Sequence, residues 1–238
     1  MLEKWKQSKF YLGWRKLKAD LAPMTFGKKV EHIWMYYKEY MFVGFLVLML
    51  LVAVVTSTVK ANQKVLASGI MTNIYIDQAG FDYLSVDYFD HLGGKKGAER
   101  VVLDYISFGD LEDAEQGSDN ISKIEALVAR VSGKLLDYMI LDKYAMETYI
   151  IYEVYMDLRE FFTEEELAAL AAENRLIYAQ QEGMEDRWPV AVDITDLPFV
   201  QDNVNSEGEV YFALSGSTPR PEICRDMWEY LHQWESKE

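Results

Sequence analysis

Side chains that could perform catalysis are sparse in this sequence. The chain has three His residues, and beyond residue 60 only His91 and His232 remain. So few imidazoles argue against a Ser-His-Asp triad or a His-rich zinc site. The sequence also lacks G-x-S-x-G, H-E-x-x-H and P-loop motifs, and "SGS" (215–217) is predicted as a turn. We therefore expect a non-enzymatic protein, with no catalytic residues, no metal centre and no cofactor.

Two acidic stretches resemble calcium loops in part. "DLEDAEQGSDN" (110–120) is rich in carboxylates, but Ala114 occupies the fifth loop position. "NVNSEGEVYFAL" (203–214) has near EF-hand spacing, but Leu214 replaces the bidentate Glu of a calcium loop. We predict solvated loops at both places, with adventitious calcium binding as the alternative.

A long apolar run organises the rest of the chain. From Met41 to Val59 there are nineteen residues without a charge. About 20 such residues are needed to cross the hydrocarbon of a bilayer as a helix. Aromatic residues precede the run, as they do at membrane interfaces. We predict a transmembrane helix at 39–59 that contacts the lipid bilayer, with a cleaved signal peptide as the alternative.

The distribution of charge predicts the orientation of that helix. Residues 1–59 carry nine basic and four acidic side chains, a net +5, whereas residues 60–238 carry fifteen and thirty-five, a net −20. The positive-inside rule keeps residues 1–38 cytoplasmic, as an amphipathic helix or a basic tail. After a linker at 60–65, residues 66–238 form an acidic extracytoplasmic domain. Because this charge repels phosphate backbones, we expect no nucleic-acid partner.

The extracytoplasmic segment alternates between strand and helix periods. Strands are predicted at 65–77, 100–108, 135–142, 188–195 and 209–215. Helices are predicted at 79–94, 118–134, 143–162 and 218–234, and a further helix begins with Thr163 and Glu166 in capping-box register. Successive strand–helix units predict an α/β fold with a mainly parallel sheet and helices on both faces. The single cysteine, Cys224, excludes an internal disulfide and is expected to be buried.

Binding groups in open parallel sheets gather beyond the carboxyl ends of the strands. Applied to the predicted strands, that rule gives a rim with five carboxylates and one aromatic side chain. The predicted binding residues are Asp77, Asp110, Glu112, Asp113, Asp142 and Tyr144. Carboxylates are costly to bury unpaired, so we expect an exposed rim that favours a basic partner surface, with a merely solvated edge as the alternative.

Three segments carry a resemblance to a known family. They are "GKLLDYMILDKYAMETYIIYEVYMDLREFFTEEELAAL" (133–170), "WPVAVDIT" (188–195) and "EVYFALSGSTPRPEICRDMWEYLHQW" (209–234). Their order resembles one lobe of the type II periplasmic-binding-protein fold, whose members serve ABC importers. Such proteins trap solutes between two lobes. Here only about 45 residues separate Asp142 from Trp188, too few for the second lobe.

The predicted anchor and the resemblance together suggest a membrane-anchored, non-enzymatic accessory protein. Its expected partner is another membrane protein, with an ABC transporter as the class. The alternative is a single-lobe surface receptor or sensor that binds a peptide, lipid or sugar. A cytoplasmic segment of about 38 residues is too short for a signalling domain, which weakens the alternative.

Overall fold

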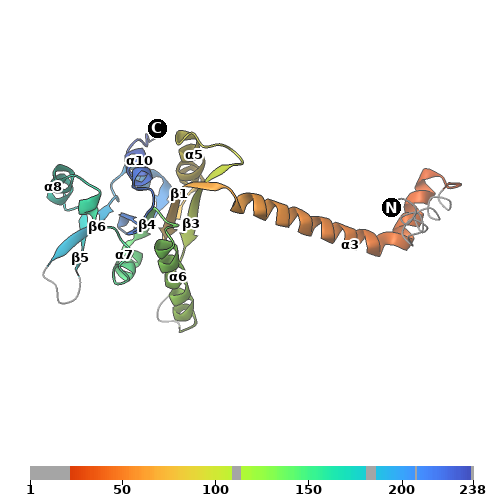
Figure 1. The fold of residues 1–238 in the computed structure, drawn as a ribbon, viewed down its shortest axis with the longest axis horizontal. Helices are drawn as coiled ribbons and strands as arrows, with labels where there is room; N and C mark the ends of the chain where they lie inside the picture. The colour runs from red at the N-terminus through yellow and green to blue at the C-terminus, as the bar shows by residue number, and fades with distance from the viewer. Residues whose placement is uncertain (1–21, 109–113, 181–185, 207, 237–238) are drawn as a thin grey trace, which may run out of the picture. The chain divides into compact units, whose positions relative to one another are not determined.

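The chain divides into two compact units, Met1–Asn62 and Gln63–Glu238, which are described separately. The computed structural model describes residues 22–108, 114–180, 186–206 and 208–236 (Figure 1). The predicted amphipathic helix at the N-terminus lies outside these residues. We refer to the second unit as the α/β domain.

The described part of the first unit is one long helix, α3 (Phe26–Ala61). Within it, Tyr37–Lys60 spans 24 residues with a mean hydropathy of 2.6, and its side chains lie exposed along its length. Of the described residues, only this helix is long and apolar enough to cross a membrane. The hydroxyls of Thr56 and Thr58 donate to carbonyls one turn earlier, those of Val52 and Val54, at 2.8 Å. The helix itself therefore satisfies these polar groups.

Little chain separates α3 from the sheet that follows. Residues 60–65, predicted as a linker, contribute the end of α3 and the start of the first strand, β1 (Lys64–Thr72). Only Asn62 and Gln63 lie between the two elements.

The centre of the α/β domain is a six-stranded sheet. Its strands in spatial order are β3 (Glu99–Ile106), β1, β4 (Tyr138–Asp142), β8 (Val210–Leu214), β6 (Arg187–Asp193) and β5 (Leu176–Gln180). A separate antiparallel pair joins β2 (Tyr75–Ile76) to β7 (Val204–Asn205).

The α/β class is confirmed, but the predicted mainly parallel sheet is wrong. Only β3, β1 and β4 run parallel, whereas the pairs β4–β8, β8–β6 and β6–β5 are antiparallel. For the pair β5–β6, the physical reason is the length of the connection. A parallel neighbour needs a crossover of about a dozen residues or more, and only six residues separate β5 from β6. The sheet is therefore mixed.

Helices cover both faces of this sheet, as predicted. One core packs the sheet against α6 (Ala114–Ser132) and α7 (Lys143–Ile150). The other packs it against α10 (Pro221–Leu231) and the helical segment before β3 (Figure 1). The remaining helical elements are η2 (Leu158–Glu160), α8 (Glu164–Ala172) and α9 (Pro198–Asn203).

The helical segment before β3 changes its winding midway. It consists of α4 (Gln78–Asp82), a π-helical turn η1 (Tyr83–Asp87) and α5 (Tyr88–His91). The rings of both Tyr83 and Tyr88 contact the ring of Tyr230 in α10, with centroids 4.3 and 4.9 Å apart. The Tyr83 hydroxyl also donates to the Tyr230 carbonyl at 2.8 Å. The π turn thus directs two tyrosines onto one residue.

Several predicted boundaries differ from the structure. The helix predicted at 143–162 ends at Ile150, and Tyr155 instead forms an antiparallel bridge with Ser215. Strand β5 has no predicted counterpart. The capping box of α8 is confirmed, because Thr163 and Glu166 exchange side-chain and backbone hydrogen bonds.

Candidate functional site

The predicted rim at the carboxyl ends of the strands is described in part. Asp110, Glu112 and Asp113 lie outside the described residues. Asp77, Asp142 and Tyr144 are described, and each has a local structural contact. Their role in binding a partner stays a prediction.

Asp77 caps the helix that follows it. Its carboxylate accepts a 2.8 Å hydrogen bond from the Gly80 backbone N–H, and its own N–H donates to the Asn203 carbonyl. An N-terminal cap of this kind stabilises a helix by about 1 kcal/mol. Asp77 therefore helps to start α4.

Asp142 has the same role for α7 and a further contact at the sheet edge. It accepts from the Ala145 N–H at 2.8 Å and from Asn73 Nδ2 at 3.4 Å. Asn73, which has a positive φ of 58°, also accepts a 2.7 Å bond from the Phe108 N–H. One asparagine thus ties together the carboxyl ends of β1, β3 and β4. Tyr144 completes the group, its ring meeting that of Phe108 edge-on at 5.9 Å.

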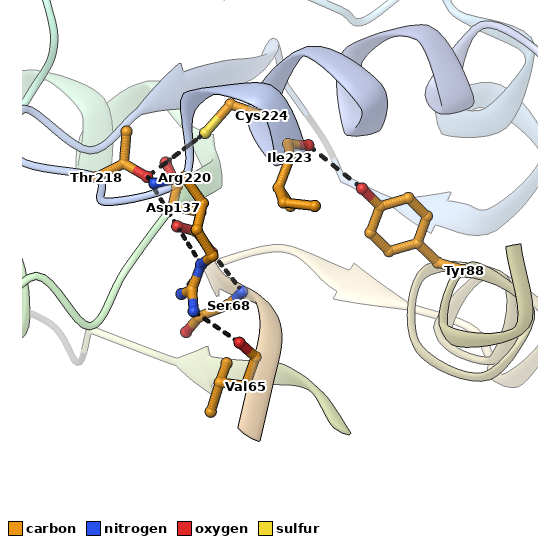
Figure 2. Close-up of polar contacts among 8 residues, drawn as sticks. All are labelled: Val65, Ser68, Tyr88, Asp137, Thr218, Arg220, Ile223 and Cys224. Carbon is orange, nitrogen blue, oxygen red and sulfur yellow. Dashed lines mark hydrogen bonds and ion pairs between the residues drawn. The ribbon is translucent and has the colours of Figure 1, made fainter. Parts of the chain in front are cut away.

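A second polar cluster lies next to the amino end of β4 and was not predicted. The carboxylate of Asp137 is fully buried. It accepts hydrogen bonds from the Ser68 N–H at 2.8 Å and the Thr218 hydroxyl at 2.7 Å. The guanidinium of Arg220 also bonds to this carboxylate (Figure 2). Its Nε lies 3.1 Å from both carboxylate oxygens, and its Nη2 lies 2.8 Å from Oδ2. Every oxygen of this buried carboxylate is therefore bonded.

Arg220 and Cys224 extend this cluster. Arg220 Nη1 donates to the Val65 carbonyl at 2.8 Å, so the guanidinium connects β1, β4 and the start of α10 (Figure 2). The Cys224 thiol lies 3.5 Å from the Asp137 carbonyl oxygen and is fully buried, as expected from the sequence. Burial raises the pKa of this thiol to about 12, so it stays protonated and packs as a small apolar group.

A cavity of about 220 Å³ opens beside this cluster. It is lined by Val65, Ser68, Arg100, Val102, Asp104, Arg130, Lys134, Leu135 and Arg220. Residues 100, 102 and 104 share one face of β3 because strand side chains alternate. Arg130 of α6 pairs with Asp104 at 2.5 Å. The Nε of Arg100 is buried, and no hydrogen-bond partner for it exists in the described chain.

Only weak signals for this cavity are present in the sequence. Arg100, Val102 and Asp104 alternate within a predicted strand, and basic residues stand near the end of a predicted helix. Asp137 falls in the predicted strand 135–142, where nothing local marks it as a buried charge. Its partner Arg220 lies 83 residues later, so the pairing depends on the tertiary fold.

Most of the second calcium-like stretch, predicted as a solvated loop, lies in regular secondary structure, namely the end of α9, β7 and β8. Asn203 is buried in α9 and donates to the Phe199 carbonyl at 2.9 Å, whereas Leu214 is the last residue of the buried strand β8. Across the described ranges, no group of three His, Cys, Asp or Glu side chains is placed to hold a metal ion.

Comparisons with protein-family models, curated proteins and solved structures give no match to this chain.

Proposed function

We propose that this protein is a non-enzymatic accessory protein, anchored by one transmembrane helix, that presents its α/β domain to another membrane protein outside the cytoplasm. The observation that carries the proposal is that an apolar helix leads directly into a folded domain. The apolar helix α3 ends at Ala61, and the first strand of a domain with its own cores begins at Lys64.

The orientation rests on the asymmetry of charge. Nine Lys and Arg residues precede Met41, and only Lys60 and Lys64 closely follow the apolar run. Positive residues are retained on the cytoplasmic side. The N-terminus is therefore cytoplasmic in this proposal, and the acidic domain is outside.

The choice of partner rests on the resemblance to one lobe of a solute-binding protein. The parallel strands β3, β1 and β4, with helices on both faces, are compatible with such a lobe. A single lobe has no opposing lobe to close on a solute. In this proposal a membrane protein of the ABC transporter class occupies the position of the missing lobe. The acidic rim around Asp142 is the contact surface that charge complementarity favours.

Orientation is tested first, with tags at both ends of the full-length chain. Protease added to intact cells is expected to digest the α/β domain and spare the N-terminal tag. A protected C-terminal tag would overturn the orientation.

Partner binding is tested by recovering the full-length chain from detergent-solubilised membranes. Transporter subunits are expected to co-purify in stoichiometric amounts. The variant Asp110→Lys, Glu112→Lys, Asp113→Lys is expected to lose them. A control with the same charge change, Asp87→Lys, Glu160→Lys, Glu173→Lys, alters three exposed residues elsewhere and is expected to keep them. Equal recovery with both variants would show that the rim is not the contact surface.

A further inference from the structure

The cavity beside β3 concentrates positive charge in an acidic domain. Four of the fourteen Lys and Arg residues that follow Asn62 line it: Arg100, Arg130, Lys134 and Arg220. Residues 60–238 carry a net charge of −20. A surface region chosen at random on this domain would be expected to be negative. The local excess of positive side chains therefore calls for an explanation.

Two of these cations already have carboxylate partners. Arg130 pairs with Asp104, and Arg220 pairs with the buried Asp137. Arg100 and Lys134 have no ion-pair partner in the described part of the chain. The cavity therefore retains two formal positive charges.

The end of α6 does not account for these cations. Carbonyl groups at a helix C-terminus attract positive charge when they lack partners. Here the carbonyls of Ala129, Arg130 and Val131 each accept a backbone N–H from residues 133–135. The Ser217 hydroxyl also donates to the Val131 carbonyl. Those carbonyls are satisfied without Arg100 or Lys134.

The fold leaves the guanidinium of Arg100 poorly bonded, because its Nε is buried and has no hydrogen-bond partner in the described chain. Buried polar atoms in folded proteins are almost always hydrogen-bonded, and a buried donor to which nothing bonds is costly. A guanidinium group presents donors in a planar fork that matches the oxygens of phosphate. The Nε itself has almost no surface, so an oxyanion in the cavity would bond the part of the Arg100 guanidinium that lines it.

The size and lining of the cavity indicate which class of ligand fits it. A volume of about 220 Å³ corresponds to about seven water molecules at ~30 Å³ each, which accommodates a phosphate group with a small organic part. Val65, Val102 and the 63 % exposed Leu135 provide apolar surface beside the cations. Two unpaired positive charges match the charge of a phosphate dianion.

We propose that this cavity binds a phosphate group, carried by a soluble phosphomonoester or by a lipid head group, with Arg100 and Lys134 as its principal ligands. Arg130 and Arg220 border the group while they remain paired with their carboxylates. This site lies in the α/β domain alone and does not depend on the accessory role proposed above.

The test uses the full-length chain in a maltoside detergent that contains no phosphate. Calorimetric binding and thermal unfolding are measured with inorganic phosphate, glycerol 3-phosphate and chloride at matched ionic strength, which controls for screening. The first two are expected to bind and to raise the unfolding temperature more than chloride does. A second arm compares phosphatidylcholine nanodiscs with and without phosphatidic acid. Stabilisation by glycerol 3-phosphate but not by phosphatidic acid assigns the phosphate to a soluble compound, and stronger stabilisation by phosphatidic acid than by glycerol 3-phosphate assigns it to a lipid.

Arg100→Gln is the decisive variant. It is expected to weaken phosphate binding by about tenfold or more, since it removes a charged hydrogen-bond donor. Without phosphate its unfolding temperature is expected to equal or exceed that of the parent, because a cation leaves a positive cavity. Arg187→Gln makes the same change at an exposed position outside the cavity and is expected to bind as the parent does. Lys134→Gln, at an exposed side chain, repeats the test if Arg100→Gln does not fold.

Three results would overturn the proposal. They are no stabilisation by any phosphate probe, stabilisation by chloride equal to that by phosphate, or unchanged binding in variants at both Arg100 and Lys134.

Discussion

The buried ion pair between Asp137 and Arg220 allows a quantitative prediction. The variant Asp137→Asn keeps the shape of the side chain but removes its charge and one acceptor oxygen. The remaining oxygen cannot serve Ser68, Thr218 and Arg220 as the carboxylate does. Removing one partner of a buried pair costs about 3–5 kcal/mol. Because Arg220 is 22 % exposed and the amide retains some bonds, we expect a loss of about 2–4 kcal/mol in the free energy of unfolding.

Pulse proteolysis of the full-length chain in detergent and urea measures this loss in the α/β domain. With a slope of about 2 kcal/mol per molar urea, a 3 kcal/mol loss lowers the midpoint by about 1.5 M. Asp119→Asn is the control, because Asp119 forms an exposed i,i+4 pair with Lys123. That change is expected to cost no more than about 0.5 kcal/mol.

A second substitution tests the reason for the loss. Adding Arg220→Met to Asp137→Asn is expected to recover part of the stability, because it removes a guanidinium left without its counter-charge. Equal stabilities of Asp137→Asn and Asp119→Asn would refute the reasoning, since the buried pair would then contribute no more than a surface pair.

Two further substitutions test packing and titration in the same domain. A Cβ on Gly69 would lie 2.4 Å from the Tyr138 ring, so Gly69→Ala is expected to cost about 1–3 kcal/mol. Gly208→Ala, with open space around it, is expected to be neutral in the same urea assay. Hydrogen bonds, first from Arg225 and then from Thr163, lower the pKa of Glu166 from 4.5 to about 2. The folded state therefore gains stability from this group above pH 4.5 and loses it as the pH falls towards 2. Glu166→Gln is expected to flatten that acid-side decline in an unfolding series against pH, and an unchanged decline would contradict the assignment.

The sequence predicts best those elements whose signals are local. The uncharged run from Met41 to Val59 lies within α3, and the spacing of Thr163 and Glu166 marks the start of α8. The break after Ile150 has no Gly or Pro to announce it. It follows from the positive φ of Glu153 and from the pairing of Tyr155 with Ser215, 60 residues away. The direction of β8 relative to β4 and β6 also depends on neighbours that no local pattern identifies.

The lack of local sequence signals also explains why the polar cluster and the cavity were not predicted. Asp77 and Asp142 are visible as polar residues after strands, but their cap bonds depend on the helices that begin there. The cavity combines residues of β1, β3, α6 and the turn before α10, which only the folded sheet brings together. The rule used to predict the binding rim considers only the carboxyl ends of strands, so it does not identify this cavity.

The π turn before β3 has a consequence for how this chain could diverge. In an α-helix, two residues five apart point about 140° away from each other. The i→i+5 bonds of η1 remove most of that difference, so Tyr83 and Tyr88 both reach Tyr230. Loss of one codon within Tyr83–Asp87 would rotate α5 by about 100° and carry His91 away from Asp226, its partner at 3.2 Å. Insertions and deletions here are therefore more disruptive than most substitutions, and the five-residue interval between the two tyrosines is a signature by which remote relatives can be sought.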